Sequence, residues 1–417
     1  MIRGNIALER AERFETPYEI SKNKLMEAAQ KALDKLERDI PKWENNFALD
    51  YSINFKYPQG INNHWECGMH TGLYWLAYEM SGNKKFRNVA EKHMPTYRER
   101  FDKKVELNDH DVGFVYIPSC IAAYKITGEE KYRQLALDVA DYYYHAGYSK
   151  KGGFILRDWD CEDMVGACRT MMDTLMNAPF LFWAGIESGK QEYIDAALSQ
   201  NRTTEKYLIR KDGSSYHHYQ FDVETHKPLY GLTWQGASNE SCWSRGHAWG
   251  VYGFPIAYGY SKEEYLINLH RDVTYYMLNK LPEDFIPHWD YIYAGSNEQP
   301  RDSSAGAISV CGMREMCRHL SDDEPQKKIF ESASAKMLEA IIDNCTGDIG
   351  KEYDGLIYHV THALPQGLGI DECAIYGDYF YLEALMRFIN PTPYEALLSA
   401  IFLLPIQFDY CLEQKLH

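Results

Sequence analysis

A short motif recurs along the chain where one predicted helix gives way to the next. A glycine, a polar stretch and an aromatic residue occur in 82–86, 128–132 and 189–193, and an alanine follows four residues later in each case; a degenerate copy occupies 261–265. A glycine that ends a helix, followed by a polar first turn and an apolar anchor, is typical of the tight turn between antiparallel helices. The chain is therefore predicted to fold as a series of helical hairpins.

Apolar periodicity predicts about a dozen helices. Their spans are 22–45, 67–80, 84–103, 111–126, 129–147, 162–187, 190–209, 243–259, 262–280, 303–319, 324–344 and 373–389. Six hairpins arranged around one axis close into a double ring of helices, so we predict an all-α fold, an (α/α)6 barrel. A solenoid of stacked hairpins is the alternative, but its repeats should be more uniform than these.

Two segments break the helical pattern. Residues 214–222 and 230–235 alternate in polarity and are rich in β-forming side chains, which predicts a small β-hairpin inserted near the mouth of the barrel. No Pro/Ser-rich linker divides the chain. We therefore expect a single domain over 1–417, with the barrel core at 20–390 and a C-terminal tail, 391–417, of unknown role.

Composition excludes several classes of protein. The net charge of −16 is opposite in sign to that of nucleic-acid-binding proteins and disfavours anionic membranes. The N-terminus has no apolar signal core, and the apolar run 396–406 is too short to span a bilayer. The 10 cysteines show no zinc spacing. These features favour a reduced, cytoplasmic protein without a metal or cofactor, and they leave its oligomeric state open.

Polar and aromatic residues gather at the starts of alternate predicted helices. They include Trp65, the run 109–111, the run 243–249, and Asp302 with Ser303. In a ring of hairpins every second helix points the same way, so these starts would meet at one end of the barrel and form a cleft. Asp111, Asp302 and Ser303 could instead be ordinary N-caps, but capping alone does not place Trp, Arg and His side chains beside the caps.

Asp173 lies in a stretch that is apolar almost all the way round and is predicted to be a buried helix. A carboxylate there is costly unless it is paired or catalytic. The alternative to catalysis is a salt bridge to Arg169, one helical turn back. If Asp111 shares a pocket with Asp173, the two carboxyl groups could perform acid–base chemistry on a sugar.

The chain resembles the unsaturated glucuronyl hydrolases, glycoside hydrolase family 88, from about residue 20 to 390. The stretches that carry the resemblance are 109–116, 173–184, 212–217, 243–250, 301–305 and 377–385. The resemblance implies an (α/α)6 barrel that acts on a small-molecule unsaturated oligosaccharide, the product that polysaccharide lyases leave. It also implies hydration of the C4=C5 double bond of the terminal uronic acid, without direct attack on the anomeric carbon.

The same resemblance assigns roles to residues. Asp173 matches the acid/base and Asp111 the second essential carboxylate. The positions that match the lining of the sugar pocket are Trp65, His110, Trp159, His217, Gln235, Arg245 and Trp249. Among these, Gln235 and Arg245 would hold the uronate carboxylate. Burial and a neighbouring Asp111 would raise the pKa of Asp173, as proton donation requires, whereas Arg169 would lower it.

The sequence also departs from the family pattern. Glu66 and Cys67 follow Trp65 where the family usually has Thr and then Asp or Asn, and His247 replaces a Gln. Members that prefer sulfated disaccharides carry Ser and Lys in a loop before the last helix, but the loop here, 361–369, has neither. The released sugar is therefore left open.

Three alternative functions remain at this point. The first is an unsaturated rhamnogalacturonyl hydrolase on the same barrel. The second is a sugar epimerase that uses His217, His247 or His359 as acid and base. The third is a non-catalytic sugar-binding protein, which would have no need for a buried Asp173.

Overall fold

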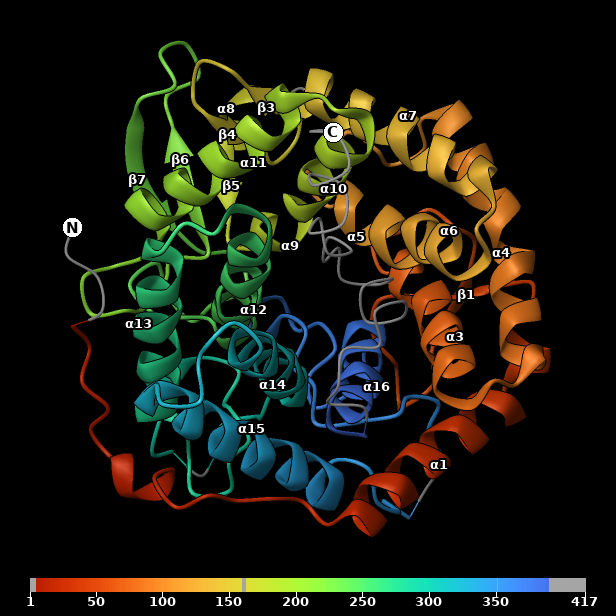
Figure 1. The fold of residues 1–417 in the computed structure, drawn as a ribbon, viewed down its shortest axis with the longest axis vertical. Coiled ribbons are helices and arrows are strands. Elements are labelled where there is room, and N and C mark those ends of the chain that lie inside the picture. Colours follow the sequence, from red (N-terminus) through yellow and green to blue (C-terminus); the bar gives the residue numbers. More distant parts are fainter. Residues whose placement is uncertain (1–4, 160–162, 297, 351, 390–417) are drawn as a thin grey trace, which may run out of the picture.

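The helices form two concentric rings in the computed structural model, which describes residues 5–159, 163–296, 298–350 and 352–389 (Figure 1). The inner ring consists of α3 (Cys67–Ser81), α5 (Val112–Tyr116) with α6 (Ala122–Thr127), α9 (Thr174–Asn177) with α10 (Pro179–Ser188), α12 (Ser244–Ser261), α14 (Ser303–Cys317) and α16 (Ile375–Ile389). The outer ring consists of α1 (Lys22–Arg38), α4 (Lys84–Lys103), α7 (Glu130–Gly147), α11 (Gln191–Thr203), α13 (Tyr265–Lys280) and α15 (Pro325–Asn344).

Shorter elements complete the described chain. A π-helical turn, η2 (Ile117–Ile121), joins α5 to α6, and another, η3 (Thr204–Leu208), follows α11. The remaining short helices are η1 (Ala11–Arg13), α2 (Ile40–Trp43), α8 (Met164–Ala167), η4 (Tyr291–Tyr293) and η5 (Leu364–Gln366). None of the described helices is long and apolar enough to cross a membrane. The predicted tail, 391–417, lies outside the described residues.

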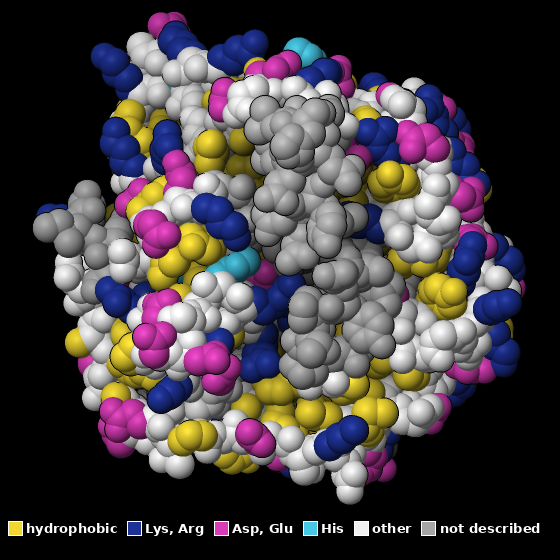
Figure 2. All heavy atoms as spheres, viewed as in Figure 1, with side chains coloured by type: hydrophobic (Ala, Val, Ile, Leu, Met, Phe, Trp, Pro, Cys, Tyr) yellow, Lys and Arg dark blue, Asp and Glu magenta, His cyan; other side chains and the backbone are white. Residues whose placement is uncertain are grey.

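The two rings differ in how they bury side chains. In α14 nearly every residue from Ser303 to Cys317 is buried, so this helix is surrounded by protein. In α1 the buried residues Leu25, Ala28 and Ala32 recur at helical spacing on one face, as expected for a helix that covers a core. The exterior is charged, and Figure 2 shows Lys and Arg side chains mixed with Asp and Glu side chains around the rim of one face. The predicted (α/α)6 barrel is confirmed.

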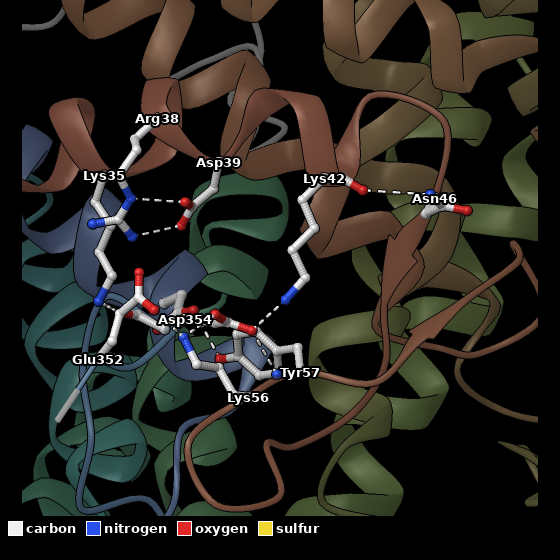
Figure 3. Close-up of polar contacts among 11 residues, drawn as sticks. Lys35, Arg38, Asp39, Lys42, Asn46, Lys56, Tyr57, Glu352 and Asp354 are labelled. Atoms are coloured by element: carbon white, nitrogen blue, oxygen red, sulfur yellow. Dashed lines mark hydrogen bonds and ion pairs between the residues drawn. The ribbon is translucent and has the colours of Figure 1, made fainter.

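The ring closes between the two ends of the described chain. Helix α16 packs against α3 in the inner ring, and α1 covers α16 from outside. The loop before α16 is held by Asp354, whose side chain is largely buried and accepts hydrogen bonds from Lys42, from Lys56 (3.2 Å) and from the backbone N–H of Tyr57 (2.9 Å) (Figure 3). This network ties the C-terminal side of the barrel to the segment that follows α2.

The predicted β-hairpin belongs to a three-stranded antiparallel sheet. Strand β6 (His218–Phe221) pairs with β7 (Pro228–Leu232), as expected, but also with β5 (Arg169–Met171), in the order β5-β6-β7. Two smaller pairs are β1 (Phe47–Ala48) with β2 (Gln59–Gly60), and β3 (Tyr148–Ser149) with β4 (Phe154–Ile155).

The continuous helix predicted over 162–187 is therefore wrong in its first half. Helix α8 ends at Ala167, strand β5 follows, and Asp173 precedes the short helix α9 instead of lying inside a long helix. The error has a physical reason, because a segment buried on all sides shows neither the helical nor the strand period.

The recurring glycines end their helices as predicted. Gly82, Gly128 and Gly189 adopt left-handed conformations with φ of 68°, 71° and 70°, and an added Cβ would meet nothing within 4 Å at any of them. In the degenerate copy the left-handed residue is Lys262, with φ of 56°. A side chain in this conformation costs about 1–2 kcal/mol.

Replacing Lys262 by glycine is therefore expected to raise the free energy of unfolding by about 0.5–1 kcal/mol, because the strain removed exceeds the entropy that glycine loses on folding. Lys262→Ala is the matched control, since it also removes the contact of Lys262 with the Tyr258 ring but keeps the strain. Urea denaturation followed by circular dichroism measures both variants. Equal stability of the two would contradict the argument.

Candidate active site

A cavity of about 430 Å³ opens at one end of the barrel and collects residues from distant parts of the chain. Seven of the nine predicted site residues line it: Trp65, His110, Asp111, Asp173, His217, Gln235 and Arg245. They come from the segments that precede α3, α5 and α9, from the β6–β7 region, and from the first turn of α12. The predicted meeting of inner-helix starts therefore occurs at this cavity, with the small sheet as an additional wall.

Asn177 links the carboxyl group of Asp111 to the backbone of Asp173. Its amide nitrogen donates to Oδ1 of Asp111 (3.2 Å) and to the backbone carbonyl of Asp173 (3.1 Å), while its Oδ1 accepts from the N–H of Phe114 (2.7 Å). Asn177 is fully buried, whereas the side chains of Asp111 and Asp173 are each 14% exposed. One buried amide therefore joins the starts of α5 and α9, the two segments from which these carboxyl groups reach the cavity.

Neither carboxyl group is used as a helix cap. Asp111 and Asp173 stand at the N-cap positions of α5 and α9, but their side chains make no capping hydrogen bond. Asp302, by contrast, caps α14 by accepting from the N–H groups of Ser304 and Ala305. The capping interpretation therefore holds for Asp302 and does not explain Asp111 or Asp173.

The surroundings of the pair favour protonated carboxyl groups. Burial raises the pKa of Asp173, and the charges of His110 and Arg245 offset only part of that rise. Burial also raises the pKa of Asp111, with Nε2 of His110 at 3.3 Å from its Oδ1 and Asp109 and Asp173 nearby as like charges. A carboxylic acid is thus available in this cavity at a pH where an ordinary aspartate is ionised.

Arg169 does not pair with Asp173, because it lies in a strand and not one helical turn back. Its Nε donates to Oε1 of Gln220 at 2.9 Å. The predicted competition between Arg169 and burial for control of the Asp173 pKa is therefore replaced by one between burial and the charges of His110 and Arg245.

Arg245 is firmly bound within the protein. Its Nη1 donates to Oδ2 of Asp302 (2.9 Å) and to the carbonyl of Thr361 (2.9 Å), and its Nη2 donates to the carbonyl of His362 (2.6 Å). The guanidinium group also lies 4.5 Å from the Trp243 ring and 4.6 Å from the Tyr376 ring. Removing it would leave the fully buried Asp302 without its partner, so an Arg245→Ala variant would lose stability as well as any contact with substrate.

Gln235 and Arg245 share a hydrogen-bond acceptor. Nε2 of Gln235 donates to the carbonyl of His362 at 3.0 Å, and Nη2 of Arg245 donates to the same carbonyl. Trp65 stacks on Tyr376 with ring centroids 5.4 Å apart and an interplanar angle of 15°. These contacts fix one wall of the cavity. Their assignment to the uronate carboxylate and the sugar ring stays a prediction.

Trp159 and Trp249 do not line the cavity. Trp159 packs against Tyr142 and Tyr143 of the outer helix α7. Trp249 is buried against Phe114, close enough to Asp173 to hold the pKa of that carboxyl group slightly below what burial alone would give. Direct contact of either tryptophan with a sugar stays a prediction.

The histidines separate into two groups. His217 lies in the cavity with Nε2 3.8 Å from Oδ2 of Asp173, and burial beside His218 and Arg245 lowers its pKa well below the usual value, so it is neutral. His247 instead bonds to Ser215 and to the carbonyl of Val273, and His359 pairs with Asp371. Neither His247 nor His359 lines the cavity, so of the three histidines considered for an epimerase only His217 is there.

Two groups of side chains have metal-ligand atoms within 4.8 Å of one another: Asp50, His64 and Glu66, and Asp109, His110 and Asp111. In the second group Asp109 accepts from the N–H of Asp111 (2.7 Å) and Asp111 accepts from Asn177, so these carboxylates already have protein donors. The expectation that no metal is required stays a prediction.

The cavity also contains residues outside the nine predicted ones, of which Asp109 and Trp243 belong to the polar runs expected at this end of the barrel. They are Asp109, Arg157, Asp163, Arg169, Met171, His218, Trp234, Trp243 and His362. Asn177 was missed as well, although its position four residues after Asp173 was a usable signal. The arginines carried no such signal, because their place depends on the unpredicted strand β5.

Known proteins are similar to this chain over most of its length. The family model described as Glycosyl Hydrolase Family 88 matches residues 39–344. An unsaturated chondroitin disaccharide hydrolase of Streptococcus pneumoniae (strain ATCC BAA-255 / R6) is 40% identical over 378 residues, which is 90% of this chain and 95% of the relative. An unsaturated glucuronyl hydrolase of Bacillus sp. (strain GL1) is 33% identical, over 85% of this chain and 94% of the relative.

Solved structures agree with the sequence comparison. The crystal structure of an unsaturated glucuronyl hydrolase from Streptococcus agalactiae superposes with a TM-score of 0.89 at 35% identity, covering 94% of this chain and 99% of that one. A mutant of the same enzyme, described as complexed with dGlcA-GalNAc6S, superposes with a TM-score of 0.83 at 33% identity, again covering 94% and 99%.

Asn177→Ala is expected to lower kcat by about 10- to 100-fold, because the Asp111 carboxyl group and the backbone of Asp173 lose their common anchor. The amide hydrogen bond favours ionised Asp111, so its loss raises the pKa of Asp111, and activity that needs this carboxylate should begin at a higher pH. A pH profile of kcat/KM measures the shift.

The matched control is Asn201→Ala, which removes another buried amide whose nitrogen donates to the carbonyl of Ala197 within α11. This variant should lose stability without moving the pH profile. The same profile for both variants would contradict a positioning role for Asn177.

Proposed function

Because the chain belongs to glycoside hydrolase family 88, we propose that this enzyme hydrolyses small unsaturated uronyl oligosaccharides of the kind that lyases release from glycosaminoglycans. The observation that carries the proposal is the pair of largely buried carboxyl groups, Asp111 and Asp173, in one cavity of about 430 Å³, with an amide that bonds the first carboxyl group and the backbone of the second residue. The names of its relatives, unsaturated chondroitin disaccharide hydrolase and unsaturated glucuronyl hydrolase, support the substrate class.

The first chemical step needs a proton donor. The double bond between C4 and C5 of the terminal uronic acid is an enol ether, since C5 carries the ring oxygen. Asp173 gives its proton to C4, and positive charge develops at C5 and the ring oxygen. The raised pKa of Asp173 keeps that proton available near neutral pH.

The second step adds water. The Asp173 carboxylate left by the first step accepts a proton from a water molecule as its oxygen bonds to C5. Asp111, which accepts a hydrogen bond from the Asn177 amide, orients the water. The resulting hemiketal opens by breaking the bond between C5 and the ring oxygen, which leaves a hemiacetal at C1 that expels the second sugar and becomes an aldehyde.

Other cavity residues hold the substrate in this proposal. Trp65 offers an aromatic face, while Gln235 and Arg245 meet at the carbonyl of His362 and form the uronate-binding wall. His217, neutral and 3.8 Å from Asp173, accepts or donates a hydrogen bond to a sugar hydroxyl. The −16 net charge of the chain opposes an anionic ligand, and because Arg245 is already paired with Asp302, this wall offsets that repulsion through its hydrogen-bond donors.

The proposal includes a cytoplasmic location and a single catalytic domain. The eight cysteines of the described chain are buried and form no disulfide, which suits a reducing compartment. A cytoplasmic enzyme of this kind would receive oligosaccharides small enough to be imported.

Asp173→Asn is expected to lower turnover of an unsaturated chondroitin disaccharide by at least about a thousandfold, because the amide cannot donate a proton to C4. Loss of the ultraviolet absorbance of the conjugated double bond measures the rate. Asp163→Asn, which neutralises another carboxylate of the same cavity, should stay within about threefold on an unsulfated substrate.

A folded Asp173→Asn enzyme that keeps a tenth of wild-type activity would refute the assignment. Failure of the wild-type enzyme on chondroitin, hyaluronan and heparin products, with turnover of unsaturated rhamnogalacturonan products, would favour the rhamnogalacturonyl alternative.

Activity is expected to survive EDTA, because proton transfer by two carboxyl groups needs no metal in this mechanism. The same absorbance assay, run before and after dialysis against the chelator, checks this. A loss that an added divalent ion restores would contradict the mechanism and direct attention to Asp50, His64 and Glu66.

A further inference from the structure

Two arginines line the active-site cavity without a place in the proposed reaction. Arg157 and Arg169 both face the space that contains Asp173, and no hydrogen bond or ion pair joins either of them to Asp111 or Asp173 in the described chain. Guanidinium groups at the wall of a sugar cavity are planar donors suited to carboxylate or sulfate groups.

The backbone brings the two arginines together. The N–H of Arg157 donates to the carbonyl of Arg169 at 2.8 Å, so the residues are direct neighbours on adjacent segments. The same ladder continues on one side to His110, whose N–H donates to the carbonyl of Arg157 (3.0 Å), and on the other to β6, where Arg169 is in register with Gln220. The arginine pair is thus built into the wall that connects the catalytic loop to the sheet.

Arg169 is held in position by a rigid partner. Its Nε donates to Oε1 of Gln220, and the Gln220 amide nitrogen is itself fixed by the carbonyls of Val165 (2.7 Å), Cys168 (3.1 Å) and Phe221 (2.9 Å). Gln220 is only 2% exposed. The orientation of the Arg169 guanidinium group is therefore set before any ligand arrives, which reduces the entropy lost on binding.

The arrangement is electrostatically unfavourable on its own. Burial and then the neighbouring Arg157 lower the pKa of Arg169. The carboxylate of Asp163 also lines the cavity and offsets one of the two charges. The guanidinium group of Arg157 makes no hydrogen bond or ion pair within the described residues, so an anionic ligand would relieve the repulsion that remains.

The pair does not contact the group that must protonate the double bond. Arg169 lies in β5 and Asp173 beyond its end, at the start of α9, and no hydrogen bond or ion pair joins Asp173 to either arginine in the described chain, whereas Nε2 of His217 lies 3.8 Å from its Oδ2. The terminal uronic acid must place its C4 against Asp173. A group that reaches Arg157 and Arg169 therefore belongs to the next sugar, the one that is released.

The other candidate for binding an acidic group on that sugar is the loop 361–369 before α16, and it offers no positive charge. It contains no Lys, Arg or Ser, and Gln366 within it donates to the carbonyl of Trp234. Arg245, the third arginine of the cavity, is occupied by Asp302 and two backbone carbonyls. Among the described cavity residues, Arg157 and Arg169 are the cations best placed to meet an acidic leaving group.

We propose that Arg157 and Arg169 form an anion-binding subsite for an acidic substituent, a sulfate ester or a carboxylate, on the sugar that the enzyme releases. This inference rests on the proposed function, because a leaving sugar exists only if the enzyme cleaves unsaturated uronides. It assigns selectivity for the second sugar to β5 and the segment that precedes Trp159.

The test compares unsaturated disaccharides that differ only in the second sugar: unsulfated, 4-sulfated and 6-sulfated. In Arg157→Gln, kcat/KM for at least one sulfated substrate should fall at least about tenfold, while the unsulfated substrate stays within about twofold. Arg157→Lys keeps the charge and should recover part of the loss. Arg169→Gln should show the same selectivity, and Arg157→Gln is the safer variant because it breaks no described hydrogen bond.

A binding measurement separates this inference from the proposed function. Calorimetry on Asp173→Asn, with and without Arg157→Gln, reports affinity for the sulfated and unsulfated disaccharides in the absence of turnover. Weaker binding of a sulfated disaccharide alone supports the subsite, even if the wild-type enzyme hydrolyses none of the substrates and the proposed function fails. Equal losses for sulfated and unsulfated disaccharides, or no loss for either, would overturn it.

Discussion

The hydrogen bonds of the Asn177 amide connect the architecture of the barrel to its chemistry. This one side chain satisfies the N–H of Phe114 in the first turn of α5, the carboxylate of Asp111 and the backbone carbonyl of Asp173. Because the amide is fully buried, losing any of these partners leaves a polar group unsatisfied, which costs about 1–3 kcal/mol. The starts of α5 and α9 are therefore fixed relative to each other, and the spacing of the two carboxyl groups follows from that.

Around this anchor the site divides into regions with different electrostatic character. The carboxyl pair lies where burial raises the pKa values of both groups, and the surrounding histidine His217 is kept neutral. One wall holds Arg245 in an ion pair with Asp302, and another holds Arg157 beside Arg169. A chain with a strongly negative overall charge thus presents positive groups inside the cavity where an anionic sugar would enter.

Much of the fold could be predicted from the sequence, since hairpins with an amphipathic outer helix leave a clear periodic signal. The helices at 67–80 and 84–103 match α3 (Cys67–Ser81) and α4 (Lys84–Lys103) almost residue for residue. The secondary structure around Asp173 was predicted wrongly, because this segment is largely buried. A buried strand such as β5 has no period that distinguishes it from a helix. That error also left open a salt bridge between Arg169 and Asp173, whereas Arg169 instead donates to Gln220.

Site residues could be predicted where polar residues recur at the starts of helices. They could not be predicted where contacts between distant segments of the chain bring them to the cavity. Asp111, Asp173 and Arg245 stood out as unusual residues in apolar or capping contexts, and all three reach the cavity. Arg157 and His362 come from loops without periodicity, so nothing local indicated that they would join it. Trp159 and Trp249 matched by position but pack outside the lining.

The closure of the ring by α1 and α16 has a consequence for how the protein is made. These helices lie more than three hundred residues apart in sequence and still pack directly against each other. During synthesis the apolar face of α1, which includes Leu25, Ala28 and Leu33, stays exposed to solvent until α16 has been made and can pack against it. Such long-range contacts slow folding and leave apolar surface exposed on the nascent polypeptide, so the barrel becomes one cooperative unit only after α16 has been synthesised.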